Sequence, residues 1–88
     1  MNGGHDMVYK GDKQYKDAYR FWVSFVNQEK FDLQRSRSDV NVKQILQVDL
    51  HNHMKVLEKM SKDKNTQHKD LVSKTAMVNA YRQILNKL

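Results

Sequence analysis

Apolar positions recur at spacings of three and four residues in three separate stretches of this chain, as they do along one side of an α-helix. The first stretch predicts a helix over about residues 14–33, with apolar positions at Tyr15, Ala18, Tyr19, Trp22, Phe25 and Val26. The second predicts a helix over residues 42–59, with Val42, Ile45, Leu46, Leu50, Met54 and Leu57. The third predicts a helix that runs to the C-terminus, with a stripe of Leu71, Thr75, Val78, Leu85 and Leu88. The pattern predicts an all-α, three-helix small domain built around Trp22.

Two polar breaks separate the three helical patterns. Residues 34–39 form a predicted loop, and Ser38, Asp39 or Asn41 is available to cap the second helix. Residues 61–66 form the second break, where Ser61 or Thr66 is available to cap the last helix. The chain has no proline, and its three glycines all precede residue 12. We therefore expect a flexible lead-in over residues 1–13 and a single helical domain over residues 14–88.

The second pattern also allows a short strand. Leu46, Val48 and Leu50 alternate with polar residues, as in a strand with one buried face. The alternative fold is therefore a strand over residues 43–48 followed by two helices. The aromatic run at residues 18–26 also suits a buried strand, but its length favours a helix.

Composition narrows the functional classes. The chain has 88 residues, of which 39% are apolar, and this is enough for one modest core but not for an enzyme with a deep cleft. Without cysteine, neither disulfides nor a cysteine zinc site stabilises it. We find no glycine-rich phosphate loop, nucleophile elbow or triad spacing, so we expect no enzyme and no cofactor. No apolar stretch is long enough to span a bilayer and no secretory signal precedes the helices, so we expect an intracellular protein and no membrane partner.

The net charge of +6 is unevenly distributed. Residues 1–40 hold seven basic and six acidic side chains, whereas residues 41–88 hold nine basic and four acidic ones. Such an excess in a small domain favours a polyanionic partner, nucleic acid before membrane, although a basic surface also serves solubility. The expected phosphate-binding residues are Arg20, Arg35, Arg37, Lys55, Lys59, Lys62, Lys64, Lys69 and Lys74.

The histidines could form a metal site and the aromatic residues could bind bases, but their spacing favours structural roles. His51, His53 and His68 with Asp49 are the available metal ligands, but residues two apart on a helix point in different directions, so we expect surface or interface histidines and no metal.

Aromatic side chains at residues 15–25 can stack on bases if exposed. Their helical spacing instead predicts a core.

The segment Ala18-Tyr19-Arg20-Phe21-Trp22 resembles the opening of the first helix of an HMG box. Residues 57–64 (LEKMSKDK) resemble the connection between the second and third helices of that family. The resemblance extends from Lys13 to Leu88 and implies three helices and DNA binding. Arg20 stands where the family often has an apolar wedge that enters a minor-groove base step, and because an arginine cannot act as such a wedge, we do not expect the kinking mechanism of the family.

The C-terminal half resembles the ribbon-helix-helix repressors through the strand-like residues 43–48, a helix over residues 49–62 and a second helix over residues 73–88. This resemblance implies a homodimer whose paired strands enter the major groove. Lys43 and Gln47, on the outward face of the strand, would then meet base edges. It leaves residues 1–40 as a helical extension before the ribbon.

Both resemblances imply double-stranded DNA as the partner. The leading hypothesis is therefore a small non-enzymatic DNA-binding protein, architectural or regulatory, that holds duplex phosphates through a basic face. The alternative is a helical adaptor or inhibitor that binds a protein partner through the apolar stripe of the C-terminal helix, with the basic charge steering the encounter. A homodimer is compatible with either hypothesis.

Overall fold

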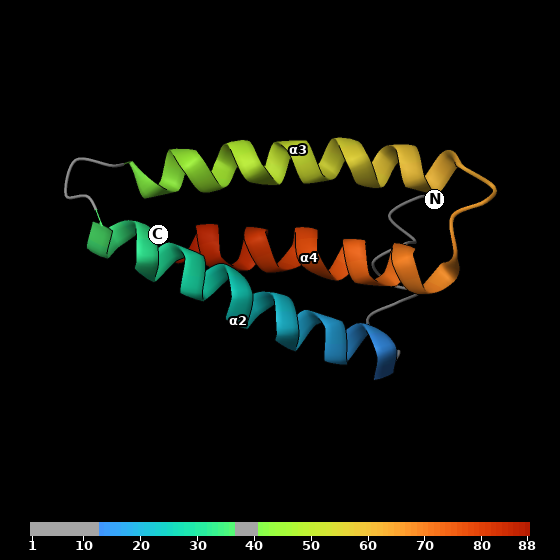
Figure 1. Cartoon of the computed structure of the whole chain (residues 1–88), viewed down its shortest axis with the longest axis horizontal. Helices are drawn as coiled ribbons and strands as arrows, with labels where there is room; N and C mark the ends of the chain where they lie inside the picture. Colours follow the sequence, from blue (N-terminus) through green and yellow to red (C-terminus); the bar gives the residue numbers. More distant parts are fainter. Residues whose placement is uncertain (1–12, 37–40) are drawn as a thin grey trace.

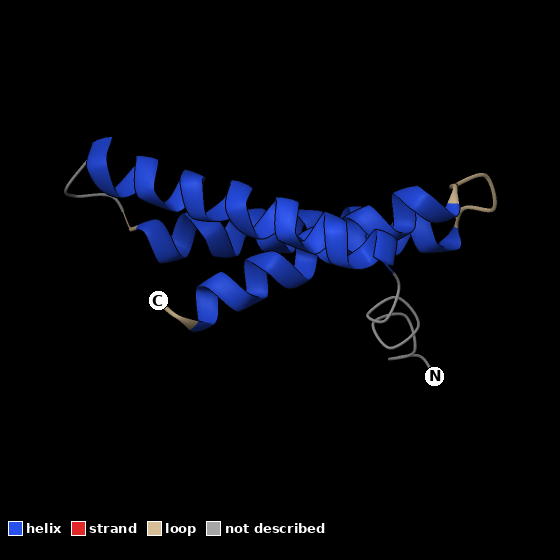
Figure 2. Cartoon of the chain, turned by 90° about the horizontal axis from the view of Figure 1, so that it is seen from below, coloured by secondary structure: helices blue, strands red, loops and turns tan. Residues whose placement is uncertain are grey.

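The computed structural model describes residues 13–36 and 41–88, and this part of the chain forms three helices and no strand (Figure 1). The helices are α2 (Lys13–Ser36), α3 (Val42–Lys62) and α4 (His68–Asn86). Figure 2 shows the same three helices after a quarter turn. The predicted all-α, three-helix fold is confirmed. The predicted lead-in lies outside the described residues except for Lys13, which is the first residue of α2.

Helix α4 is the centre of the fold, because it packs against both α2 and α3 while these two touch each other little (Figure 1). A helix that packs on two neighbours needs an apolar surface on more than one side. Accordingly, α4 buries eight residues: Val72, Thr75, Ala76, Val78, Ala80, Tyr81, Ile84 and Leu85. By contrast, α2 buries only Tyr15 and Val26, and α3 buries only Leu46.

The core has two clusters along α4. At its N-terminal end, Val72 and Ala76 pack against Tyr15 of α2, with Trp22 at the edge of the cluster. Further along α4 lies the second cluster, which is contributed by all three helices and consists of Val26, Leu46, Tyr81, Ile84 and Leu85. The core is therefore centred on α4 and not on Trp22, which is only half-buried.

The helix ends explain where the chain turns. Asn41 caps α3 as predicted, since its side-chain oxygen accepts a 3.1 Å hydrogen bond from the backbone N–H of Gln44. The predicted caps of α4 are wrong. Ser61 lies inside α3 and donates its hydroxyl to the Glu58 carbonyl at 2.8 Å, and α4 begins only after Gln67, whose side chain makes no capping bond. Asp63 organises the turn instead, accepting from the Asn65 N–H at 2.9 Å.

A further expectation is wrong. Residues 43–48 are helical within α3, so the strand of the ribbon-helix-helix alternative does not form. Leu46 is fully buried while Val48 is 53% exposed, so burial along α3 has the period of a helix. Of the apolar stripe of the C-terminal helix, Thr75, Val78 and Leu85 are buried in the protein itself, Leu71 is half-buried and Leu88 is 42% exposed.

None of the helices in the described ranges has the length and apolar character needed to cross a membrane.

Candidate functional site

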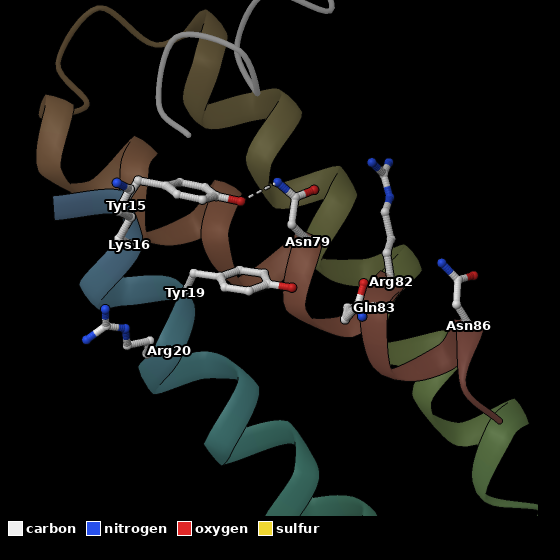
Figure 3. A pocket seen from close by; sticks show the side chains of 8 residues that line it. All are labelled: Tyr15, Lys16, Tyr19, Arg20, Asn79, Arg82, Gln83 and Asn86. Carbon is white, nitrogen blue, oxygen red and sulfur yellow. Dashed lines mark hydrogen bonds between the residues drawn. The ribbon is translucent and has the colours of Figure 1, made fainter. Parts of the chain in front are cut away.

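A pocket with three basic side chains in its lining lies between α2 and α4 (Figure 3). Its volume is about 500 Å³. Two stretches line it, with Tyr15, Lys16, Tyr19 and Arg20 from α2 and Asn79, Arg82, Gln83 and Asn86 from α4. Three of these eight side chains are cations, and no carboxylate is among them.

Two tyrosines form one wall of this pocket, which we call the α2–α4 pocket. Tyr15 and Tyr19 are four residues apart, so they lie one above the other on the same side of α2. Their rings are stacked, with centroids 5.9 Å apart and an angle of 14° between the planes. Tyr15 is buried and accepts a 2.8 Å hydrogen bond from Asn79 Nδ2. Tyr19 extends from α2 towards Gln83 and is only half-buried (Figure 3).

The cations stand at the edges of the pocket. In Figure 3 the Arg20 guanidinium points outward from α2, away from α4, and the Arg82 side chain extends from α4 away from the tyrosine rings; both residues are exposed. The guanidinium of Arg82 rests 3.8 Å from the Met54 sulfur of α3. Asp17 is the nearest acidic residue along α2, and its carboxylate accepts a 2.8 Å bond from Lys13 that lowers its pKa. The pocket therefore offers hydrogen-bond donors and positive charge to an anion.

A second basic surface lies on α3. Lys55, Lys59 and Lys62 are exposed and follow one another at spacings of four and three residues. They therefore share the side of α3 turned away from the buried Leu46. Lys62 lies 3.5 Å from the Glu58 carboxylate, an exposed pair that is worth little in stability. We call Lys55, Lys59 and Lys62 the α3 lysine face.

The other predicted phosphate contacts are scattered. Arg35 is exposed in the last turn of α2, Lys64 in the turn after α3, and Lys69 in the first turn of α4. Arg37 lies outside the described residues. Lys43 and Gln47 are exposed one turn apart on α3, so they do not belong to a strand that enters a groove.

Lys74 differs from the other predicted contacts because it is half-buried. Its Nζ lies 2.8 Å from His53 Nδ1 and 3.6 Å from the Met77 sulfur. Burial lowers the pKa of Lys74. Burial also lowers the pKa of His53, and the Lys74 ammonium lowers it further against a smaller opposing effect of Asp49. The neutral imidazole therefore accepts a hydrogen bond from Lys74, which joins α3 to α4.

A neighbouring polar contact joins α4 to α2. The Tyr81 hydroxyl donates to Glu29 Oε1 at 3.2 Å, and the Tyr81 ring lies 5.2 Å from the His53 ring. Burial raises the pKa of Glu29, its hydrogen bond from Tyr81 opposes the rise, and Asp49 adds to it. Burial and the Glu29 charge raise the pKa of Tyr81. Tyr81 therefore connects all three helices, through its hydrogen bond to Glu29 on α2 and its ring contact with His53 on α3.

Two of the aromatics predicted for the core are exposed. Phe21 is 59% exposed and Phe25 51%, and both contact Trp22 edge-to-face at centroid distances of 4.9 and 5.4 Å. Trp22 is held in place by a 3.2 Å hydrogen bond from its Nε1 to the Ser73 hydroxyl. The prediction of a buried aromatic cluster is therefore right for Tyr15 and wrong for Phe21 and Phe25.

Sequence reasoning placed Arg20 at a site but missed Lys16 and Arg82. The signal for Lys16 was present, because Lys16 and Arg20 repeat at the same four-residue interval as Tyr15 and Tyr19, one position later. Arg82 comes from a distant part of the chain and joins them only through the packing of α4 on α2. Among the described residues, no three potential metal ligands come together.

The chain matches no protein-family model, and searches of curated proteins and of solved structures found no significant match. The resemblances to HMG boxes and to ribbon-helix-helix repressors therefore rest on short sequence motifs.

Proposed function

We propose that this protein is a small non-enzymatic DNA-binding protein that holds duplex phosphates through its basic side chains. The observation that carries the proposal is the α2–α4 pocket, where Lys16, Arg20 and Arg82 surround a hollow without a carboxylate. Phosphate oxygens accept hydrogen bonds from such side chains, and each neutralised phosphate releases counterions to solution.

The α3 lysine face supports the proposal as a second contact region. Lysine side chains on one exposed helix face bind phosphates as point charges and do not read the base sequence. We therefore expect an architectural or regulatory role in which DNA is positioned, with little discrimination between sequences. The protein-partner alternative is less favoured, because Val78 and Leu85 of its proposed surface on the C-terminal helix are buried in the core.

The test is fluorescence anisotropy of a labelled duplex titrated at several salt concentrations. Arg20→Gln and Arg82→Gln should each reduce the slope of log affinity against log salt by about one unit. Lys30→Gln is the matched control, because Lys30 lies on α2 outside both basic regions and over the Phe31 ring at 4.8 Å. We expect it to leave the slope unchanged.

The α3 lysine face is tested with the double variant Lys55→Gln/Lys59→Gln, which should lower the slope by about two units. Failure of the duplex to bind at low salt would refute the proposal. So would unchanged slopes in both arginine variants.

A further inference from the structure

The α2–α4 pocket has features that duplex phosphates alone do not use. It is hollow, whereas the phosphates of a duplex lie on a convex surface that flat basic faces such as the α3 lysine face can contact. One of its walls is aromatic, because Tyr15 and Tyr19 are stacked side by side. Its α4 side carries the side-chain amides of Asn79, Gln83 and Asn86, which donate and accept hydrogen bonds.

We propose that this pocket accepts one unpaired nucleotide of a DNA strand, with the base against Tyr19 and the two flanking phosphates at Arg20 and Arg82. The inference rests on the proposed function, which supplies DNA as the partner. It adds that the protein prefers DNA with an unpaired position over a fully paired duplex.

The placement of the aromatic rings supports a base at Tyr19. The Tyr15 and Tyr19 centroids are 5.9 Å apart, which is too close for a base to enter between the two rings. Tyr15 is buried and engaged by Asn79. Tyr19 is half-buried, and its ring lies between Arg20 and Gln83 in Figure 3, so it is the ring that a base can reach. Base–aromatic stacking tolerates any base, because every base has a π-face.

The placement of the charges supports a strand and not a free nucleotide. Arg20 on α2 and Arg82 on α4 line opposite edges of the pocket, and in Figure 3 both guanidinium groups point outward from the rings. A nucleotide within a strand has a phosphate on each side of its sugar, whereas a free mononucleotide carries its phosphate at one end. Gln83, which faces the Tyr19 ring in Figure 3, can pair with the edge of a base through its amide.

The experiment compares three labelled duplexes: one fully paired, one with a single-nucleotide bulge, and one with an abasic bulge that keeps the phosphates but lacks the base. The bulged duplex should bind at least about fivefold tighter than the paired duplex, as expected for one stacked base. The abasic bulge should lose this preference. Thymidine monophosphate, added as a competitor in large excess over the DNA, should not displace the bulged duplex.

Protein variants locate the preference. Tyr19→Leu should abolish the preference for the bulge, whereas Tyr19→Phe should keep it. Phe25→Leu, which removes an exposed ring from the same helix, is the matched control and should keep the preference. Because Tyr19 packs beside a core cluster, Gln83→Glu provides a second test at an exposed position. Its carboxylate should repel the strand and abolish the preference, while Gln44→Glu on α3 should not.

The outcomes separate the two proposals. Equal binding of the three duplexes would overturn the unpaired-nucleotide site and leave DNA binding standing. Efficient displacement by thymidine monophosphate would also overturn it, because the site would then belong to a free nucleotide. Loss of preference in Phe25→Leu but not in Tyr19→Leu would place the base outside the pocket and overturn the assignment. Absence of binding to every duplex would refute both proposals.

Discussion

Asn79 Nδ2 donates a 2.8 Å hydrogen bond to the Tyr15 hydroxyl across 64 residues of sequence, and this bond joins the first turn of α2 to the middle of α4. Tyr15 is buried in the core cluster with Val72 and Ala76, so its hydroxyl has little access to water. The same side chain also forms a wall of the α2–α4 pocket. The bond therefore couples the stability of the α2–α4 interface to the shape of the candidate site.

Removing the hydroxyl tests this coupling. Tyr15→Phe keeps the ring but leaves the Asn79 amide without this acceptor, so we expect a loss of about 1 kcal/mol in the free energy of unfolding. Urea denaturation of the wild type, Tyr15→Phe, Asn79→Ala and the double variant gives the interaction energy of the pair. Strictly additive effects would show that the two side chains do not interact. Tyr19→Phe, at the half-buried neighbouring ring, is the control.

A buried leucine should account for much of the packing between α3 and the rest of the protein. Leu46 is the one buried residue that α3 contributes within the described structure, and it is fully enclosed. Leu46→Ala should cost about 2–5 kcal/mol, because it removes apolar contacts and leaves a cavity. Val48→Ala, two residues further on the exposed side, should cost less than about 0.5 kcal/mol in packing. Similar losses in the two variants would contradict the helical register of α3.

The cap of α3 is open to an equally direct test. Asn41 Oδ1 accepts from the Gln44 N–H at 3.1 Å, and its backbone is extended, as expected of a residue that precedes a helix. Asn41→Ala should destabilise the protein by about 1 kcal/mol in thermal or urea unfolding. Asn52→Ala makes the same substitution at an exposed position inside α3, where alanine has the higher helix propensity, and should be neutral or stabilising. If Asn41→Ala left the free energy of unfolding unchanged, the Asn41 side chain would not stabilise the start of α3.

The helices were predictable because each carries a repeat of three and four residues over several turns, and no proline interrupts them. The bounds of α2 were underestimated, since Gln34 to Ser36 are polar yet helical. A polar sequence without glycine or proline continues a helix readily once packing has fixed its preceding turns. The local alternation of Leu46, Val48 and Leu50 misled because three positions are too few to separate the two periods: Leu46 and Leu50 are one helical turn apart and share a side of α3, while Val48 lies on the exposed side.

The position of the core and the pocket was less accessible from sequence. Aromatic density suggested a core around Trp22, but α4 is the centre because it packs against both other helices, and its buried residues include the small Thr75, Ala76 and Ala80 as well as larger apolar side chains. The pocket depends on which turn of α4 lies beside which turn of α2. That register follows from tertiary packing, so Arg82 had no local signal linking it to Arg20.

Acidification should destabilise the protein through His53. Because burial and the Lys74 ammonium lower the pKa of His53 in the folded state, the unfolded chain binds this proton more readily. Stability should therefore be lost as pH falls through the ordinary histidine value of 6.5 towards the lowered one, and it should be regained as pH rises again. Glu29 works in the opposite direction, since its raised pKa makes stability fall as pH rises above 4.5.

The difference between the wild type and His53→Gln separates these two effects, because Glu29 is common to both proteins. Urea denaturation from about pH 7.5 to about pH 5.5 should show the wild type losing more stability than His53→Gln over this window. His51→Gln, which alters an exposed histidine two residues away on α3, is the control and should follow the wild type. If the wild type and His53→Gln lost the same stability between these pH values, protonation of His53 would not destabilise the folded protein, and its contact with Lys74 would not depend on a neutral imidazole.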